Sequence, residues 1–474
     1  MIKTKKLILC LLLILFLAHN AFSQDETWDL HQLSGAGQTL KQGLLAAAAG
    51  QVLNWTFSVF NNYIYGAEWG FPTRQSVYNN LSSAWKWEEE DDFVVNQIGH
   101  PVMGFLHYGP GRASGFGFYE SVFFTAFGSA TWEIWGERNQ ASINDFITST
   151  IGGIAPGEIF YRLYLEAHAA GLPEPLIFFI NPMVGLQRLV TRWNPPDTGR
   201  NLYELRYHLG FGYAETNFSV SGIEDNIFYF RGFFPELGFR AVYGNPFEQQ
   251  TSVPFRHFEI DVAFGMDLGN YNHLRIISDG YLFSFSPVYS ETTAMSTGLS
   301  LHFDFVGMGQ FGMEDATIDQ YSNALNWTIK YQRFLSPETT FQMKLHNGLT
   351  FFGVSKYFAD IEIVKPRGSI KTGYNNFGLG LNSKSFFILD QSRWGRIEAS
   401  LMCYALWTIP GTTNLSSGTA YWLFSDIAYS RNLTRNLSMG LSYFYANEWG
   451  FFNGDFWDQK KSNEIIKMFV AWNF

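Results

Sequence analysis

The stretch Ile466-Lys467-Met468-Phe469-Val470-Ala471-Trp472-Asn473-Phe474 decides the fold class of this chain. Every second residue, from Ile466 to Phe474, would lie on one face of a strand, and the residues between them on the other face. In a membrane barrel one face of each strand meets lipid and the other meets the lumen, and closure leaves no unpaired edge in the lipid. The stretch therefore predicts the closing strand of an outer-membrane β-barrel. Phe474 would be the terminal aromatic residue through which the barrel-assembly machinery engages the chain.

The same period of two recurs over residues 200–474. It is clear in the segments 203–213, 257–266, 325–332, 341–346, 396–403 and 437–444, and period two over this much sequence indicates half-buried strands. Short segments such as Leu335–Glu338 and Leu433–Asn436 are typical of periplasmic turns, and Gly307–Gln320 and Trp449–Ser462 of extracellular loops. We expect an antiparallel membrane β-barrel of about twelve strands over residues 196–474. A soluble β-sandwich is the alternative that the aromatic outer faces disfavour.

The beginning of the chain has the pattern of a secretory leader. Lys3, Lys5 and Lys6 precede the apolar run 7–18, and Ala21-Phe22-Ser23 precedes Gln24. The run is too short to span a membrane as a helix. We expect a cleavable signal peptide over residues 1–23, and no other stretch has the length and hydropathy that we would assign to a membrane helix. The predicted location is the bacterial outer membrane.

Composition agrees with a barrel and excludes some partners. Aromatic residues make up 18% of the chain and charged residues 16%, yet the mean hydropathy is −0.06. Near-neutral hydropathy is expected when half of each strand faces a polar lumen. The formal net charge of −10 argues against nucleic acid as a partner; outer-membrane lipid is the partner we expect, and oligomeric state cannot be derived. After cleavage Cys403 would be the remaining cysteine, so the fold would not depend on a disulfide.

The strand pattern also predicts which side chains enter the lumen. The charged and histidine residues on the inward positions are Glu204, Arg206, His208, His257, Glu259, Asp261, Lys344, His346, Arg396, Glu398 and Asp426. Their mixed signs predict paired charges across a narrow interior more than a ring of one sign.

Residues 24–195 have a helical pattern and carry the unusual polar residues. A helix is expected over residues 37–65, followed by the acidic run Glu88–Asp92, which we interpret as a solvated turn. Ser142 is a suitable N-cap for a further helix. Polar residues on glycine-lined, otherwise apolar helix faces are costly unless they are paired. We therefore expect a single polar network, formed by Asn96, His100, Glu120, Glu133, Glu137, Asn144, Asp145, Glu158 and Arg162.

This network has two interpretations. It could fix the register of the helices, or it could be a site in which His100, Glu133, Glu137 and Asp145 are catalytic candidates. His100, Glu133 and Glu137 could hold a divalent metal, although no cofactor is expected. Ser121 or Ser129 could act as a nucleophile beside a histidine base, but neither lies in a Gly-x-Ser-x-Gly turn.

A family resemblance rests on a dense set of motifs between residues 85 and 190. They are Asp92-Phe93, Asn96-Gln97, Gly99-His100-Pro101, Gly104, Arg112, Gly115, Glu120, Trp132-Glu133, Gly136-Glu137, Ser142-Ile143-Asn144-Asp145, Gly152-Gly153, Gly157-Glu158, Arg162, Asn181-Pro182-Met183, Gly185 and Arg188. This segment resembles the DUF3943 family, whose members are bacterial envelope proteins of unknown function, often with a barrel-like second half. The resemblance implies an envelope location and supplies no catalytic roles.

Three functions follow as hypotheses. The first is a barrel that binds or passes a small ligand or lipid, with the helical region as a plug. The second is an envelope enzyme, lipid-directed or metal-assisted, built on the His/Glu/Asp cluster. The third is a structural or envelope-assembly protein without chemistry. The first is preferred because barrels commonly carry ligands.

Overall fold

The computed structural model describes residues 40–64, 66–87, 93–192, 195, 200–220, 228–247, 251–267, 272–309, 318–358, 373–412, 417–453 and 458–474. The predicted leader and the acidic run Glu88–Asp92 lie outside the described residues. The chain divides into two compact units. The helical unit comprises residues 1–91 and 98–200. The barrel unit comprises residues 92–97 and 201–474, so the short segment that begins at Phe93 groups with the barrel, where its ring lies 6.0 Å from that of Phe305.

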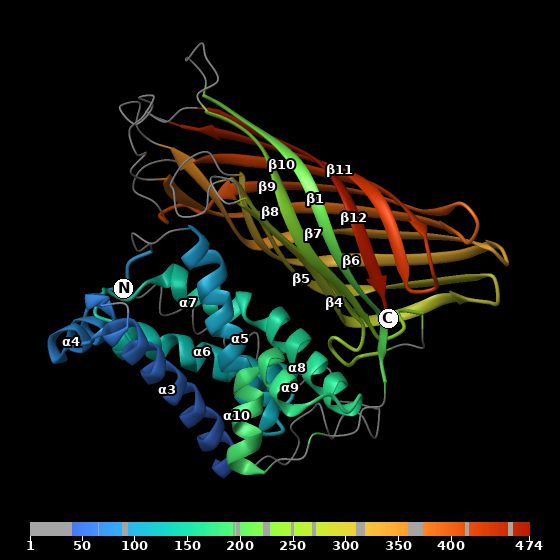
Figure 1. Ribbon diagram of the computed structural model, residues 1–474. Coiled ribbons are helices and arrows are strands. Elements are labelled where there is room, and N and C mark those ends of the chain that lie inside the picture. Colours follow the sequence, from blue (N-terminus) through green and yellow to red (C-terminus); the bar gives the residue numbers. More distant parts are fainter. Residues whose placement is uncertain are drawn as a thin grey trace. The chain divides into compact units, whose positions relative to one another are not determined.

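The barrel unit is a closed barrel of twelve antiparallel strands in sequence order, in which β1 pairs with β12 (Figure 1). This confirms the predicted fold class. The strands are β1 (Leu202–Val220), β2 (Phe228–Tyr243), β3 (Phe258–Met266), β4 (Asn272–Tyr289), β5 (Thr293–Gly309), β6 (Ile318–Ser336), β7 (Thr339–Phe358), β8 (Gly373–Gln391), β9 (Gly395–Thr408), β10 (Gly418–Asn432), β11 (Leu437–Phe452) and β12 (Gln459–Asn473).

The faces of the closing strand are those that its sequence predicts. Ile466, Met468 and Trp472 are exposed on the outside, whereas Phe469 and Ala471 are buried inside. Phe474 continues the outer face, because its backbone N–H donates to the Leu205 carbonyl at 2.9 Å and its ring lies 6.0 Å from that of Tyr207. A barrel exterior of this kind is what hydrocarbon selects.

Strand direction places the short connections 290–292, 337–338, 392–394 and 433–436 at one end of the barrel, the end at which β1 begins and β12 finishes. The predicted periplasmic turns are therefore at a common end. The predicted loops are shorter than expected: β5 continues to Gly309 and β6 begins at Ile318, and β11 continues to Phe452 and β12 begins at Gln459. Residues at these ends extend the sheet because cross-strand hydrogen bonding outlasts the alternation that the sequence shows.

The helical unit consists of α3 (Leu40–Tyr63), a 3-10 turn (Glu68–Gly70), α4 (Arg74–Ser82), α5 (His100–Ala113), α6 (Phe118–Trp135), α7 (Ile143–Gly152), α8 (Ile154–Ala169), α9 (Glu174–Ile180) and α10 (Pro182–Thr191). A π-helical turn, Val95–Gly99, precedes α5. The central helix is α5, which packs against α3, α6, α7, α8 and α10 (Figure 1). Ser142 caps α7 as predicted, since its Oγ accepts from the Asp145 N–H at 3.3 Å.

Small residues allow α5 to approach its neighbours closely. A Cβ on Gly104 would lie 1.8 Å from the Ser149 carbonyl oxygen, and a Cβ on Gly128 would lie 2.4 Å from the His107 ring. Glycine at these positions lets α7 and α6 reach van der Waals distance of α5. Close backbone contact through small residues is the packing mode typical of helices in a lipid environment.

The helical unit has a polar interior and an apolar exterior on several helices. Asn54, Ser58 and Asn61 are buried faces of α3, whereas Leu44, Val52 and Trp55 of the same helix are exposed. Among the described residues, α3 is the one helix with the length and hydropathy of a membrane span, contrary to our expectation that no stretch beyond the leader would reach that limit.

Candidate functional site

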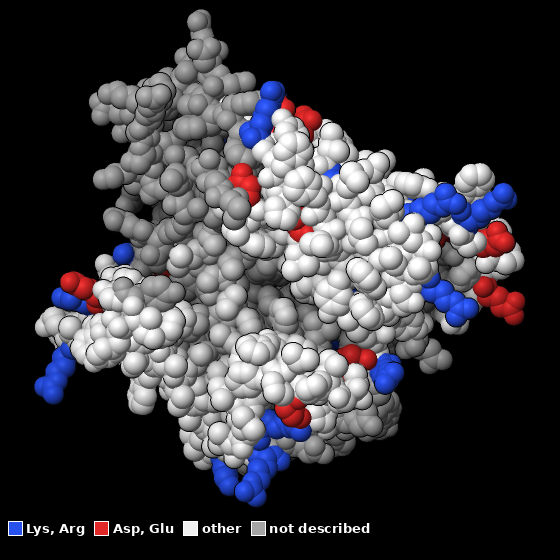
Figure 2. Space-filling model, in the orientation of Figure 1, with Lys and Arg blue, Asp and Glu red and all other residues white. Residues whose placement is uncertain are grey.

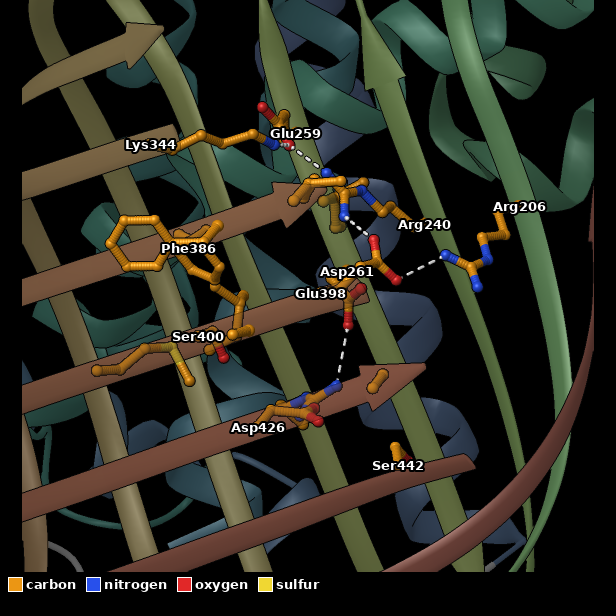
Figure 3. A pocket seen from close by; sticks show the side chains of 18 of the residues that line it. Arg206, Arg240, Glu259, Asp261, Lys344, Phe386, Glu398, Ser400, Asp426 and Ser442 are labelled. Carbon is orange, nitrogen blue, oxygen red and sulfur yellow. Dashed lines mark hydrogen bonds and ion pairs between the residues drawn. The ribbon is translucent and has the colours of Figure 1, made fainter. Parts of the chain in front are cut away.

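A cavity lies in the barrel lumen, among side chains that enter it from most of the strands (Figure 3). It has room for water-sized molecules amounting to about 170 Å³. The charged residues of its lining are five bases and five acids: Arg206, Arg240, Arg275, Lys344, Lys467, Glu259, Asp261, Asp279, Glu398 and Asp426. His208, His346 and Phe386 also line it. The formal charges of the lining therefore balance.

The first ion-pair network of the cavity is built around Glu259 and Glu398. Arg240 bonds to Glu259 at 2.9 Å and lies 3.6 Å from Glu398, which also accepts from Arg206 at 2.9 Å. Lys344 pairs with Glu259 as well. Because β1, β2, β3, β7 and β9 contribute these groups, the network connects strands that are far apart in the sequence.

Two further ion-pair groups extend from this network. Lys330 bonds to Glu259 and to Asp279, both at 2.8 Å, and its side chain is 2% exposed. Arg275 bonds to Asp426 at 3.0 Å and lies 3.4 Å from Asp261. An uncompensated charge at such a depth would be costly, so the pairing is what allows the lumen to be both charged and narrow.

Glu236 organises the side of the lumen near β12. It pairs with Lys467, and its two oxygens also lie 2.9 Å from His208 and 2.8 Å from His273. Lys467 is the inward neighbour of Met468 in the stretch that decides the fold. The alternation of that stretch thus places one apolar side chain in the lipid and the next, charged one in the lumen.

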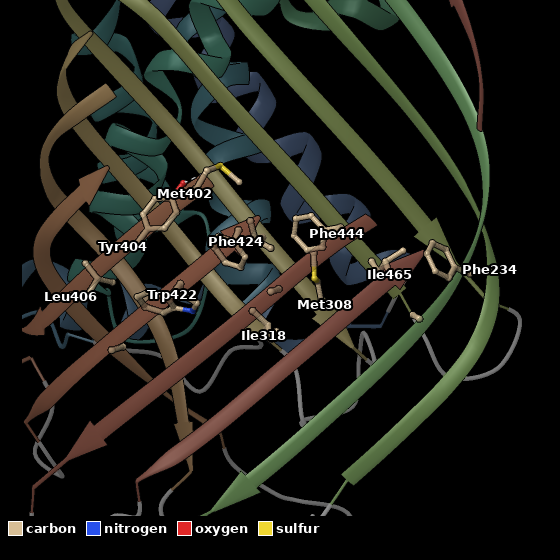
Figure 4. Packing of buried hydrophobic residues seen from close by; sticks show 14 residues of the cluster. Phe234, Met308, Ile318, Met402, Tyr404, Leu406, Trp422, Phe424, Phe444 and Ile465 are labelled. Atoms are coloured by element: carbon tan, nitrogen blue, oxygen red, sulfur yellow. Dashed lines mark hydrogen bonds between the residues drawn. The ribbon is translucent and has the colours of Figure 1, made fainter. Parts of the chain in front are cut away.

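An apolar layer fills the lumen further toward the long-loop ends of the strands (Figure 4). Its largest members are Phe234, Met308, Ile318, Met402, Tyr404, Leu406, Trp422, Phe424, Phe444 and Ile465. Trp422 is 1% exposed and Phe424 is fully buried. The Tyr404 hydroxyl donates to Asp304 at 3.0 Å, and Lys384 pairs with the same carboxylate at 2.7 Å. A layer of interlocked aromatic side chains of this kind closes the lumen on that side of the cavity.

The sequence predicted much of this lining but not all of it. All eleven predicted inward residues lie in the barrel interior, in the cavity lining or in its ion pairs. The predicted pairing of opposite charges is confirmed. Sequence reasoning missed the partners Glu236, Arg240, Arg275, Asp279, Lys330, Lys384 and Lys467. The period-two pattern of β2, β4, β6 and β8 carries the signal for most of them, at positions between outward apolar residues.

In the helical unit, the predicted polar residues separate into several groups. His100 lies with Asp145 and Ser149: its Nδ1 is 3.1 Å from Ser149 Oγ, and its Nε2 is 3.5 Å from Asp145 Oδ1. Asn144 donates to Asp145 at 2.9 Å. Asp145 and Ser149 are 1% and 3% exposed. A substrate in solution would not reach this serine, so the group joins α5 to α7.

Glu158 anchors the second group. It pairs with Arg112 at 2.9 Å and with Arg162 at 2.8 Å, and the Tyr108 hydroxyl donates to it at 2.8 Å. Burial and Glu158 together raise the pKa of Tyr108 well above its usual range. Burial alone would lower the pKa of Arg112, but Glu158 outweighs it and the net direction is upward. The group therefore holds its charges and joins α5 to α8.

The remaining predicted residues have separate places. Glu133 Oε2 accepts from the Ser142 N–H at 2.8 Å, and Glu137 is buried near the end of α6. Glu120 accepts from the Gly117 N–H at the start of α6. Asn96 lies in the barrel unit, fully buried. The prediction of one network is therefore wrong in geometry, because α5 separates these residues into local contacts.

The described part of the chain contains no group of three or more His, Cys, Asp or Glu side chains arranged to hold a metal ion. His100, Glu133 and Glu137 are thus not brought together as ligands. The two candidate nucleophiles bond to backbone instead: Ser121 Oγ donates to the Gly117 carbonyl at 2.8 Å, and Ser129 Oγ to the Phe146 carbonyl at 3.5 Å.

A third polar group, which the sequence did not predict, joins α3 to the unit. His107 Nε2 lies 2.8 Å from Asn54 Oδ1, and Asn54 donates to the Gly128 carbonyl at 3.1 Å. Gln51 donates to Thr131 at 2.8 Å. Burial lowers the pKa of His107 to about 4, against smaller raising effects from the Gly50 and Met103 backbones. His107 is therefore neutral near pH 7.

Comparison with known proteins agrees with the family resemblance. Residues 84–183 match the family model described as domain of unknown function DUF3943, so the chain contains a DUF3943 domain, most of which lies in the helical unit. No curated protein matches the sequence.

Several solved outer-membrane barrels are similar in strand arrangement. The toluene transporter TodX of Pseudomonas putida is 8% identical, with coverage of 60% of this chain and 92% of that one and a TM-score of 0.22. The translocator domain of the autotransporter NalP from Neisseria meningitidis is 10% identical, with 62% and 95% coverage and a TM-score of 0.24. A Pseudomonas aeruginosa FadL homologue is 8% identical, with 57% and 90% coverage and a TM-score of 0.24.

Proposed function

We propose that this protein is an outer-membrane barrel that binds a small polar molecule in the lumenal cavity and passes it only when the apolar layer moves. The cavity is the observation that carries the proposal. Its five bases and five acids suit a ligand that is zwitterionic, or neutral with several hydroxyl groups, because a ligand of one sign would leave part of the lining unpaired. Export through a cleaved leader is part of the same proposal.

Closure of the lumen supports a gated barrel more than an open pore. The apolar layer around Trp422 and Phe424 is made by the barrel strands themselves. A helical plug remains a prediction, and it would be an additional means of closure. The enzyme alternative gains no support from the His100 group, because Asp145 and Ser149 are buried.

Ligand binding by the purified protein in detergent tests the proposal. We would titrate glycine betaine, a free amino acid, a neutral sugar, a dicarboxylate and a polyamine by calorimetry. We expect binding of the zwitterions or the sugar, and loss of that binding in Lys344→Met, which removes one charge from the lining. Lys460→Met is the matched control, since Lys460 is exposed on β12. Binding of the dicarboxylate or the polyamine alone, or no loss in Lys344→Met, would overturn the proposal.

A further inference from the structure

Three helices of the helical unit carry a continuous supply of exposed apolar side chains with almost no charge among them. On α3, Val52 is 58% exposed and Trp55 62%; on α9, Phe179 is 80% exposed; on α10, Leu189 is 73% and Val190 76% exposed. The charged residues of these helices are Lys41, Glu174 and Arg188, and the last two pair with each other at 2.6 Å. Water is a poor solvent for such a surface.

The interior of the unit has the opposite character. Asn54, His107, Glu158 and Arg112 are all at most 1% exposed, and they bond to each other or to neighbouring helices. Glycine-mediated approach, as at Gly104 and Gly128, completes the helix contacts. Hydrogen-bonded polar groups and small residues inside, with large apolar residues outside, is the distribution that a hydrocarbon solvent selects.

We propose that the apolar exterior of α3, α9 and α10 is embedded in the acyl region of the phospholipid layer that surrounds the barrel. A protein partner would need one patch, whereas these residues lie on three helices, of which α3 and α10 both pack on α5. Figure 2 shows the described surface largely free of charged side chains, which occur in small separate groups.

The length of the chain keeps the unit near that membrane. Ten residues separate Thr191, at the end of α10, from Leu202, at the start of β1. A fully extended segment of that length reaches about 35 Å. On the polar side of the unit, Thr73, Gln75, Ser76 and Asn79 line a separate polar depression, so the unit has one surface for lipid and another for water.

Depth-dependent fluorescence quenching of the full chain tests this proposal. The background would be Cys10→Ser/Cys403→Ser, which removes both cysteines of the sequence. An environment-sensitive dye would be attached to Val52→Cys, Phe179→Cys or Leu189→Cys, in vesicles of phosphatidylethanolamine and phosphatidylglycerol with brominated acyl chains. Leu209→Cys, on the barrel exterior, is the positive control, and Gln75→Cys the aqueous control.

We expect the three helical sites to lose emission to brominated acyl chains as Leu209→Cys does, and to resist aqueous iodide. Gln75→Cys should show the reverse. Iodide quenching at the helical sites equal to that at Gln75→Cys would overturn the proposal. Shielding from both quenchers would also overturn it, because it would mean that a protein surface covers these helices.

Discussion

The helical unit and the barrel unit distribute their polar residues in the same way but use the interior differently. Both bury charges and expose large apolar side chains. In the helical unit, polar groups such as Glu158 and His107 occupy the contacts between helices. In the barrel, ten charged residues surround a cavity, and a separate apolar layer adjoins it. The comparison shows that the helical interior serves packing, whereas the lumen has room for a ligand.

The largest effect expected in the helical unit follows from removing one member of its buried ion-pair group. Arg112→Ala should lower the free energy of unfolding of this unit by about 3 to 5 kcal/mol, because Glu158 is left charged and buried. Thermal loss of the helical circular-dichroism signal of the full chain in detergent measures this effect. Arg188→Ala, in the exposed pair with Glu174, should cost under about 1 kcal/mol. Equal effects would mean that burial of the Arg112 pair does not matter.

Acid should weaken the same unit through His107. Its pKa is about 4 in the folded protein and 6.5 as the model value. Between these values the unfolded chain binds one more proton at this position, so stability falls as pH decreases through this window. The total loss is about 3 kcal/mol.

Unfolding of the full chain at several pH values checks this slope. His107→Asn should remove it, and His168→Asn should leave it unchanged. A slope that survives in His107→Asn would assign the acid sensitivity to other groups.

Helix proximity gives a smaller effect. Gly104→Ala should destabilise the helical unit by about 1 to 3 kcal/mol, because its Cβ would overlap the Ser149 carbonyl and force α5 from α7. Gly43→Ala is the matched control. Its Cβ would meet Phe116 at an ordinary 3.6 Å, so the helix should gain roughly 1 kcal/mol. Thermal unfolding of both variants compares them, and a neutral Gly104→Ala would contradict the close approach of the two helices.

The barrel was predictable from sequence because its signal is local. Lys467 and Met468 alternate in the primary sequence as they do across the wall of the barrel. The partner of Lys467 is Glu236, which is 231 residues away, and such pairings depend on closure and register that a period of two does not contain. The helical network failed for a related reason. The spacing of His100, Glu133 and Asp145 shows that they are polar and buried, but not which of them share a helix interface.

Single-channel conductance in planar bilayers tests most directly the central claim that the apolar layer of the barrel closes its lumen. The account predicts little conductance for the wild type and a large, sustained increase in Trp422→Ala/Phe424→Ala. Trp327→Ala, on the exposed outer face of β6, should behave as the wild type. An open wild-type pore, or a double variant that stays closed while folded, would contradict the claim.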